Sequence, residues 1–204
     1  MIYEDTKIFD HLRAAIDNTV CEFQKHTEDF LSERDIQAWL FAELRRRTIR
    51  IRYMYEVKDN EKRFKRPSIE INPVRTEYFP YQKAGCCFDI AILSGEPNRE
   101  ANIWHQPCRI GIEIKLWQAC EGGDWEGHRG PQPDLKKLQD YKSNQKGLPF
   151  TGIAMLFVHP RARRSKVAEL IFGSASESNF PDDGVALLLV NNESCWWKSD
   201  EWTK

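Results

Sequence analysis

The sequence contains no apolar run that approaches the ~20 residues needed for a membrane-spanning helix. Its start, Met-Ile-Tyr-Glu-Asp-Thr-Lys, lacks the pattern of a signal peptide. It also has no internal repeat and no low-complexity segment. Because 204 residues suit one core and are few for two domains, we expect a single soluble, cytoplasmic domain spanning residues 1–204.

The spacing of the cysteines gives no sign of a metal site either. The six cysteines show no metal-ligand spacing, and the adjacent Cys86 and Cys87 suit neither a Cys-x-x-Cys clip nor a disulfide framework. We expect all six to be reduced, and most of them to be small buried side chains.

Overall positive charge is absent too, since the formal net charge is −1, and this excludes a bulk basic signal for nucleic acid. Basic residues are nevertheless grouped locally. The three groups are Arg45–Arg47 with Arg50 and Arg52, Lys62–Arg66, and Arg161 with Arg163, Arg164 and Lys166. Each group alone is typical of a solvated surface, but three in one small domain favour a phosphate track.

The most informative stretch is Arg109–Trp117, which alternates as a strand with one buried face does. Ile110, Ile112, Ile114 and Leu116 point one way, and Gly111, Glu113, Lys115 and Trp117 point the other. Cys87–Leu93 alternates in the same way, with Phe88, Ile90 and Ile92 as its apolar set.

The two runs are expected to pair as an antiparallel hairpin closed evenly around Ala101, so that opposing residue numbers sum to 202. This assumption places Asp89 opposite Glu113, Cys87 opposite Lys115 and Ala91 opposite Gly111. Two opposing carboxylates repel each other, and a cation between them would explain the pair. The small pair beside them would leave space above the sheet.

The remaining pattern predicts an α/β protein, a three-layer α/β/α sandwich with a central mixed sheet. The N-terminal segment (about residues 1–47) is helical, and Ser32 with Asp35 predicts a capping box, with Leu31 and Ile36 as a hydrophobic staple. The predicted helices are Lys7–His26, Glu33–Arg47, Asp134–Gln145 and Arg161–Phe172. The other predicted strands are Ile49–Val57, Val74–Tyr81, Thr151–His159 and Val185–Val190, with a short extended piece at Ile69–Ile71.

Four polar residues stand out as a candidate site: Glu33, Asp89, Glu113 and Lys115. Carboxylate oxygens suit Mg²⁺, which binds few carboxylates alongside waters and phosphates. The backbone carbonyl of Ile114 could complete the coordination. Lys115 could orient or deprotonate a water, or stabilise charge on a phosphate.

Asp89, followed by Glu113-Ile114-Lys115 on the next strand and preceded by a helix bearing Glu33, resembles the PD-(D/E)xK nuclease superfamily, whose fold is restriction endonuclease-like. The resemblance extends over Ser32 to His159 in element order, with Phe88 where the family name has Pro. It implies that Asp89 and Glu113 are metal ligands, that Lys115 is the catalytic lysine, and that Glu33 is an accessory ligand or holds a water. The gap from Asp89 to Glu113 is longer than a tight hairpin and allows an inserted loop.

The function expected from the sequence is a Mg²⁺-dependent DNA nuclease, with Mn²⁺ as a substitute, in restriction or phage defence. RNA remains an alternative substrate, and a homodimer would supply one site for each strand of a duplex. Candidate nucleic-acid contacts are Lys137, Tyr141, Arg161, Arg163, Arg164, Lys62 and Arg63. Two alternatives stay open: a catalytically inactive module on the same fold that binds nucleic acid or protein, and an unrelated α/β protein.

Overall fold

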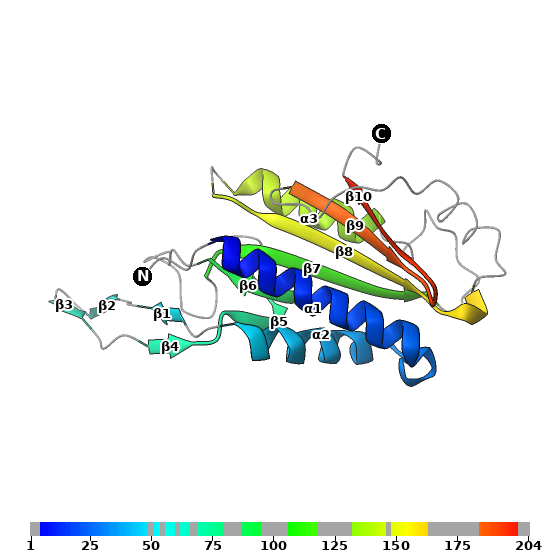
Figure 1. The fold of residues 1–204 in the computed structure, drawn as a ribbon. Helices are drawn as coiled ribbons and strands as arrows, with labels where there is room; N and C mark the ends of the chain where they lie inside the picture. The colour runs from blue at the N-terminus through cyan, green and yellow to red at the C-terminus, as the bar shows by residue number, and fades with distance from the viewer. Residues whose placement is uncertain are drawn as a thin grey trace.

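The computed structural model describes residues 5–48, 51–53, 56–59, 62–65, 69–79, 87–94, 106–117, 132–145, 148–162 and 184–199. In this part of the chain it is an α/β protein with three α-helices and a six-stranded mixed sheet (Figure 1). No helix within these ranges is long and apolar enough to cross a membrane.

The sheet has the strand order β10-β9-β8-β7-β6-β5. The pairs β7–β8 and β8–β9 are parallel, and the other pairs are antiparallel. These six strands are β5 Val74–Tyr78, β6 Phe88–Leu93, β7 Cys108–Trp117, β8 Thr151–Val158, β9 Gly184–Val190 and β10 Cys195–Ser199. The helices are α1 Asp5–Lys25, α2 Glu33–Arg47 and α3 Gln132–Asn144, and two single-turn 3-10 helices are η1 Thr27–Asp29 and η3 Pro160–Ala162.

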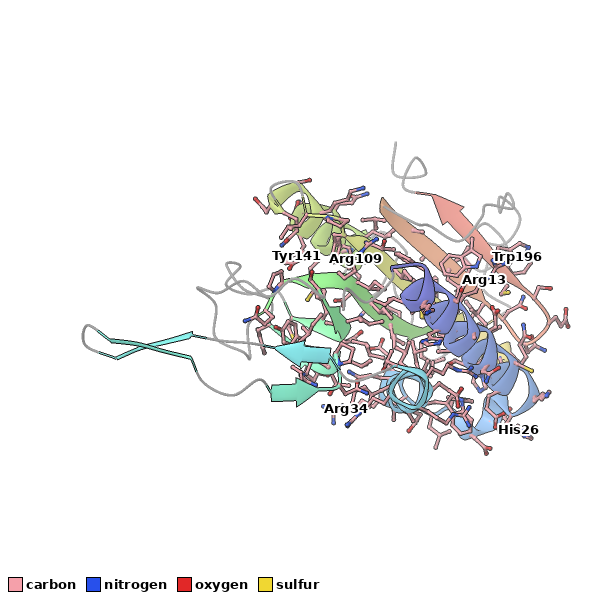
Figure 2. All side chains as sticks on the ribbon, turned by 60° about the vertical axis from the view of Figure 1, so that its left-hand side comes forward. Arg13, His26, Arg34, Arg109, Tyr141 and Trp196 are labelled. Atoms are coloured by element: carbon pink, nitrogen blue, oxygen red, sulfur yellow. The ribbon has the colours of Figure 1, made fainter. Side chains whose placement is uncertain are left out.

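Helices cover both faces of the sheet (Figure 2). On one face, α1 and α2 pack against the buried side chains of Ile110, Ile112, Ile114 and Leu116, as the alternation of β7 predicts. On the other face, α3 packs through Leu135, Leu138 and Tyr141. The strands β8 and β9 are buried on both faces, which explains why their sequences are continuously apolar.

The predicted register of β6 and β7 is confirmed where the ladder is regular. Ile90 pairs with Ile112, Ala91 with Gly111 and Ile92 with Ile110, so the residue numbers sum to 202. The register shifts between Ile92 and Leu93, where Leu93 pairs with Cys108. The even closure therefore places Asp89 and Glu113 at the same end of the strand pair.

The prediction for Phe88 is wrong. Ile90 and Ile92 face α1 and α2, whereas Phe88 belongs to the cluster on the α3 face. Its partner on β5, Tyr78, lies in that cluster as well. Glu77, which precedes Tyr78, has a φ of 47°, so the backbone leaves regular strand geometry where the alternation changes face.

The expected space above Ala91 and Gly111 is also absent, because aromatic rings fill it. A Cβ on Gly111 would lie 3.0 Å from Phe150 Cζ and 3.1 Å from Phe88 Cε2. Both rings are fully buried. Gly111 is therefore required by close packing rather than by a ligand.

The start of α2 confirms the capping box. The Asp35 carboxylate accepts hydrogen bonds from the N–H and the hydroxyl of Ser32, at 2.8 and 2.9 Å. The predicted staple is not formed, because Leu31 is 71% exposed while Ile36 is buried. The cap alone therefore fixes the first turn of α2, which carries Glu33.

Several elements differ from the predictions. Within the strand expected over Ile49–Val57, the described residues form β1 Ile51–Tyr53 and the start of β2 Glu56–Asp59, and β1 pairs with β4 Ile69–Ile71. The pair β2–β3, with β3 at Lys62–Lys65, was not predicted, and neither was β10. Most of the helix expected over Arg161–Phe172 lies outside the described residues.

Candidate active site

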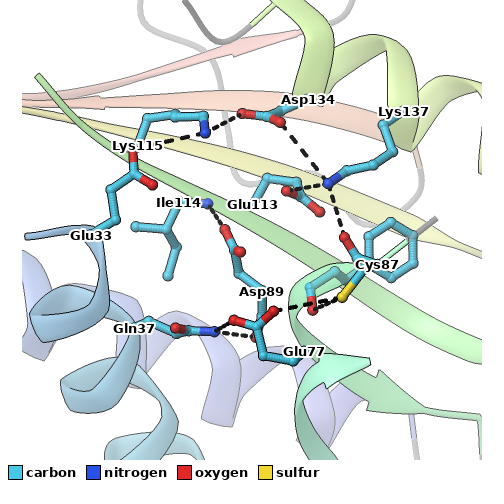
Figure 3. A network of polar contacts seen from close by, with 11 residues as sticks. Glu33, Gln37, Glu77, Cys87, Asp89, Glu113, Ile114, Lys115, Asp134 and Lys137 are labelled. Carbon is cyan, nitrogen blue, oxygen red and sulfur yellow. Dashed lines mark hydrogen bonds and ion pairs between the residues drawn. The ribbon is translucent and has the colours of Figure 1, made fainter. Parts of the chain in front are cut away.

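The four candidate side chains meet at one end of the β6–β7 pair (Figure 3). Asp89 comes from β6, Glu113 and Lys115 from β7, and Glu33 from the first turn of α2. The first turns of α3 add two more charged groups: Asp134, which the sequence did not single out, and Lys137, which it predicted only as a nucleic-acid contact. The site is therefore built by two strands and the beginnings of two helices.

Glu113 is the most deeply buried charged side chain of this group, with 4% of its side chain exposed. Its Oε2 lies 2.6 Å from the Nζ of Lys137. The same Nζ donates to the carbonyl oxygen of Cys87 at 2.9 Å and lies 4.0 Å from Asp134 Oδ1. Lys137 thus connects α3 to β7 and to the residue directly before β6.

Lys115 connects the two helices across the sheet. Its Nζ lies 3.8 Å from Glu33 Oε1 on α2 and 3.7 Å from Asp134 Oδ2 on α3. Glu33 Oε1 also accepts a hydrogen bond from the N–H of Leu116 at 3.4 Å. The ammonium group of Lys115 is therefore held between two carboxylates.

Asp89 is fixed through both its side chain and its backbone. Its Oδ2 accepts a hydrogen bond from the N–H of Ile114 at 2.7 Å. Its carbonyl accepts from the Nε2 of Gln37 at 2.7 Å, and the same nitrogen donates to Glu77 Oε1 at 3.1 Å. Gln37 lies one turn after Glu33 on α2, so it ties this helix to β6.

The carboxyl groups of the site have raised pKa values. Burial, followed by the nearby charge of Asp89, raises the pKa of Glu113 to about 8, although Lys137 opposes the shift. Burial also raises the pKa of Asp89, against the hydrogen bond from Ile114, and those of Asp134 and Glu33. These shifts arise because carboxylates lose hydration where few positive groups compensate them.

The pKa of Lys115 shifts in the direction that keeps its ammonium group charged. Burial lowers its pKa, but the carboxylates of Asp134 and Glu33 outweigh that effect, so the net shift is upward. Lys115 is consequently an ammonium group at neutral pH, suited to binding an anion or holding a water rather than to removing a proton.

The donor set fits a divalent cation in chemical type and in charge. Glu113, Asp89, Asp134 and Glu33 outnumber the two ammonium groups, which leaves a formal charge of −2 if all six are ionised. The Oε1 atom of Glu113 is buried and has no hydrogen-bond partner. Within the described ranges, no three side chains of His, Cys, Asp or Glu converge as a metal site. The residues that would hold Mg²⁺ are Asp89 and Glu113, together with the backbone carbonyl of Ile114, which follows Glu113 on β7.

The expected nucleic-acid contacts differ in outcome. Lys137 lies in the site, but Tyr141 is buried against Phe88 and Phe150, and its hydroxyl accepts the N–H of Cys108 at 3.2 Å. In this structure Tyr141 therefore packs in the core and does not face solvent. The side chains of Lys62, Arg63 and Arg161, together with all of Arg163 and Arg164, lie outside what the structure describes.

The signal that could have identified Asp134, and the contact of Lys137 with Glu113, is the spacing of Asp134 and Lys137. These residues are three apart at the start of a helix that precedes a parallel strand, so their side chains share one helical face. The spacing does not reveal which part of the sheet that face covers.

Comparisons of the chain with protein-family models, with curated proteins and with solved structures give no match. The choice of a function therefore depends on the residues of the site and on their geometry.

Proposed function

We propose that this protein is a Mg²⁺-dependent nuclease that hydrolyses phosphodiester bonds in DNA, at a site formed by Asp89, Glu113, Lys115 and Glu33. Restriction or defence against phage is a natural context for such an enzyme. Mn²⁺ would substitute for Mg²⁺, since both accept carboxylate oxygens.

The observation that carries this proposal is the excess of buried carboxylate at the end of β6 and β7. Asp89 and Glu113 lie near one another, and the charge of Asp89 contributes to the raised pKa of Glu113. Keeping like charges close costs stability, and a fold gains nothing from it unless a cation compensates them. The adjacent ammonium group of Lys115 adds a group suited to a phosphate or a water.

The residues divide the chemistry among themselves. Asp89 and Glu113 would hold the metal, and the hydrogen bond from Ile114 to Asp89 Oδ2 orients the Asp89 carboxylate. Lys115 binds the scissile phosphate or orients the attacking water, and Glu33 and Asp134 position its ammonium group from opposite sides. When bound, Mg²⁺ supplies Lewis-acid chemistry that polarises the phosphodiester and lowers the pKa of a water.

The finer fold assignment belongs to the same proposal. We infer a restriction endonuclease-like fold, supported by the order of α2, the antiparallel strands β5, β6 and β7, then α3 and the parallel strand β8. This is the segment over which the sequence resembles the PD-(D/E)xK superfamily.

The test is cleavage of plasmid and linear DNA with Mg²⁺ or Mn²⁺ by the wild type, Glu113→Ala and Lys115→Ala. We expect metal-dependent cutting by the wild type and its loss in both variants. Lys136→Ala is a matched control, because Lys136 is an exposed lysine on α3. It should cut like the wild type.

Two results would contradict the proposal. One is the absence of cutting on any DNA or RNA substrate together with the absence of metal binding. The other is cutting that persists in both Glu113→Ala and Lys115→Ala. DNA binding without cleavage would instead favour the inactive binding module.

A further inference from the structure

Lys137 makes contacts in the site that the sequence did not predict. Its Nζ makes the shortest ion-pair contact of the site, 2.6 Å from Glu113 Oε2. A second, independent contact fixes the same atom, since it donates to the carbonyl of Cys87 at 2.9 Å. The ammonium group is therefore held at the carboxylate that is expected to bind the metal.

Lys115 does not take this position. Its Nζ is held between Glu33 and Asp134, at 3.8 and 3.7 Å, which leaves Glu113 to Lys137 (Figure 3). The two lysines thus occupy different parts of the site. A buried carboxylate needs a positive partner, and in this structure Glu113 obtains it from α3.

We propose that Lys137 is an internal counter-ion of the metal site: it holds the Glu113 carboxylate in the metal-free protein, and a divalent cation displaces it. This inference rests on the proposed function, because it assumes that Glu113 binds the metal. Two cations cannot share one carboxylate without mutual repulsion, so the ammonium group and the metal compete.

Displacement would not remove Lys137 from the site. Asp134 is one turn before it on α3, with Oδ1 at 4.0 Å, and the Cys87 carbonyl remains on its other side. The released ammonium group would stay at the edge of the site, where it can bind a phosphate oxygen of the substrate. The protein would thus keep a positive group for the substrate only once the metal is in place.

The experiment compares the Mn²⁺ affinity of the wild type, Lys137→Gln and Lys136→Gln, measured by loss of the free-ion EPR signal at one pH. Glutamine removes the charge and keeps an N–H donor on a polar side chain. Without the competing ammonium group, we expect Lys137→Gln to bind Mn²⁺ at least about tenfold more tightly than the wild type. Lys136→Gln makes the same change of net charge on an exposed residue of α3 and should bind like the wild type.

Thermal melting gives a readout that does not depend on catalysis. In metal-free buffer, Lys137→Gln should melt below the wild type because Glu113 has lost its partner. Saturating Mn²⁺ should raise its melting temperature by more than it raises that of the wild type. If Lys137→Gln does not fold, Lys137→Met keeps the apolar stem of the side chain and takes its place.

The outcomes separate the two proposals. Equal or weaker binding by Lys137→Gln and Lys137→Met, with clear binding by the wild type, would overturn the counter-ion role and leave the nuclease proposal standing. Binding by Lys137→Gln alone would support the counter-ion role strongly. Absence of binding in every variant would overturn both.

Discussion

Two neighbouring regions of the same sheet face differ in what they bury, one aromatic rings and the other charged groups. The aromatic half consists of Ala91 and Gly111 beneath Phe88, Tyr141 and Phe150, and the charged half consists of Glu113 and Lys115 beneath Asp134 and Lys137. They are adjacent on β7, and α3 supplies residues to both. Asp134 and Lys137 lie at its start, and Leu138 and Tyr141 follow directly.

The aromatic half is filled completely. Ring centroids lie 4.7 Å apart for Tyr141 and Phe150 and 5.1 Å apart for Phe88 and Tyr141, in edge-on arrangements that favour packing. The charged half is buried as well, but its carboxylates exceed its ammonium groups and their pKa values are raised. The aromatic half therefore stabilises the fold, whereas the charged half buries carboxylates at a cost in stability, which is the cost that the proposed function would explain.

The largest expected effect is the loss of cleavage in Glu113→Gln. This change keeps the shape of the side chain and removes an expected metal ligand. The rate should fall at least about a hundredfold, the upper end of what losing even an outer-shell partner of a metal costs. Stability at pH 7 should fall modestly, because the ion pair with Lys137 is lost while the amide oxygen can still accept a hydrogen bond from it. Single-turnover cleavage together with urea denaturation checks both expectations, and a large loss of stability would place Glu113 with the aromatic half.

The pH dependence of stability should come mainly from the charged half. The pKa of Glu113 rises from 4.5, its ordinary value, to about 8 in the folded protein. Between these values the folded state binds the proton and the unfolded state does not, so metal-free stability should fall as pH rises from about 4.5 to about 8. Asp89, Asp134 and Glu33 shift in the same direction.

Urea denaturation across this pH range in a chelator measures the effect. Glu113→Gln should reduce the slope, and Gly111→Ala should keep it. A slope that survives in Glu113→Gln would assign the effect to the other carboxyl groups.

A smaller effect is expected from Gly111→Ala in the aromatic half. The new Cβ would lie 3.0 Å from Phe150 Cζ and 3.1 Å from Phe88 Cε2, and those buried rings also contact Tyr141. Overpacking should exceed the entropy gained from replacing glycine, with a net loss of about 1–2 kcal/mol. The free energy of unfolding measures this loss. Metal affinity of the folded fraction should not change, and a marked drop would show that the two halves are coupled.

Much of the backbone arrangement around the site could be predicted from local patterns in the sequence. The apolar set of β7 depends on the period of two residues, which the sequence displays. The register that brings Asp89 to the same end as Glu113 followed from that period together with the assumption of an even hairpin closure. The position of Glu33 followed from Ser32 and Asp35, because a capping box fixes the first turn of a helix. These are local rules.

The contributions of α3 could not be predicted in this way. The spacing of Lys137 and Tyr141 places them on one helical face, but only the packing of that face on the sheet decides that Lys137 meets Glu113 while Tyr141 meets Phe88. Phe88 lies on the α3 face for the same reason, the packing of α3 on the sheet, which gathers three buried rings there. Such choices depend on tertiary packing, which strand alternation does not encode.

Tyr141→Phe gives the smallest expected effect and tests where the border between the two halves lies. The hydroxyl of Tyr141 accepts the N–H of Cys108 at 3.2 Å, so its removal should cost about 1 kcal/mol of unfolding free energy. DNA affinity should stay unchanged because the ring is buried in the core. Lys137→Gln, one turn earlier, should weaken DNA binding in the presence of metal. A loss of DNA binding in Tyr141→Phe with unchanged stability would return Tyr141 to the nucleic-acid surface and move that border by one helical turn.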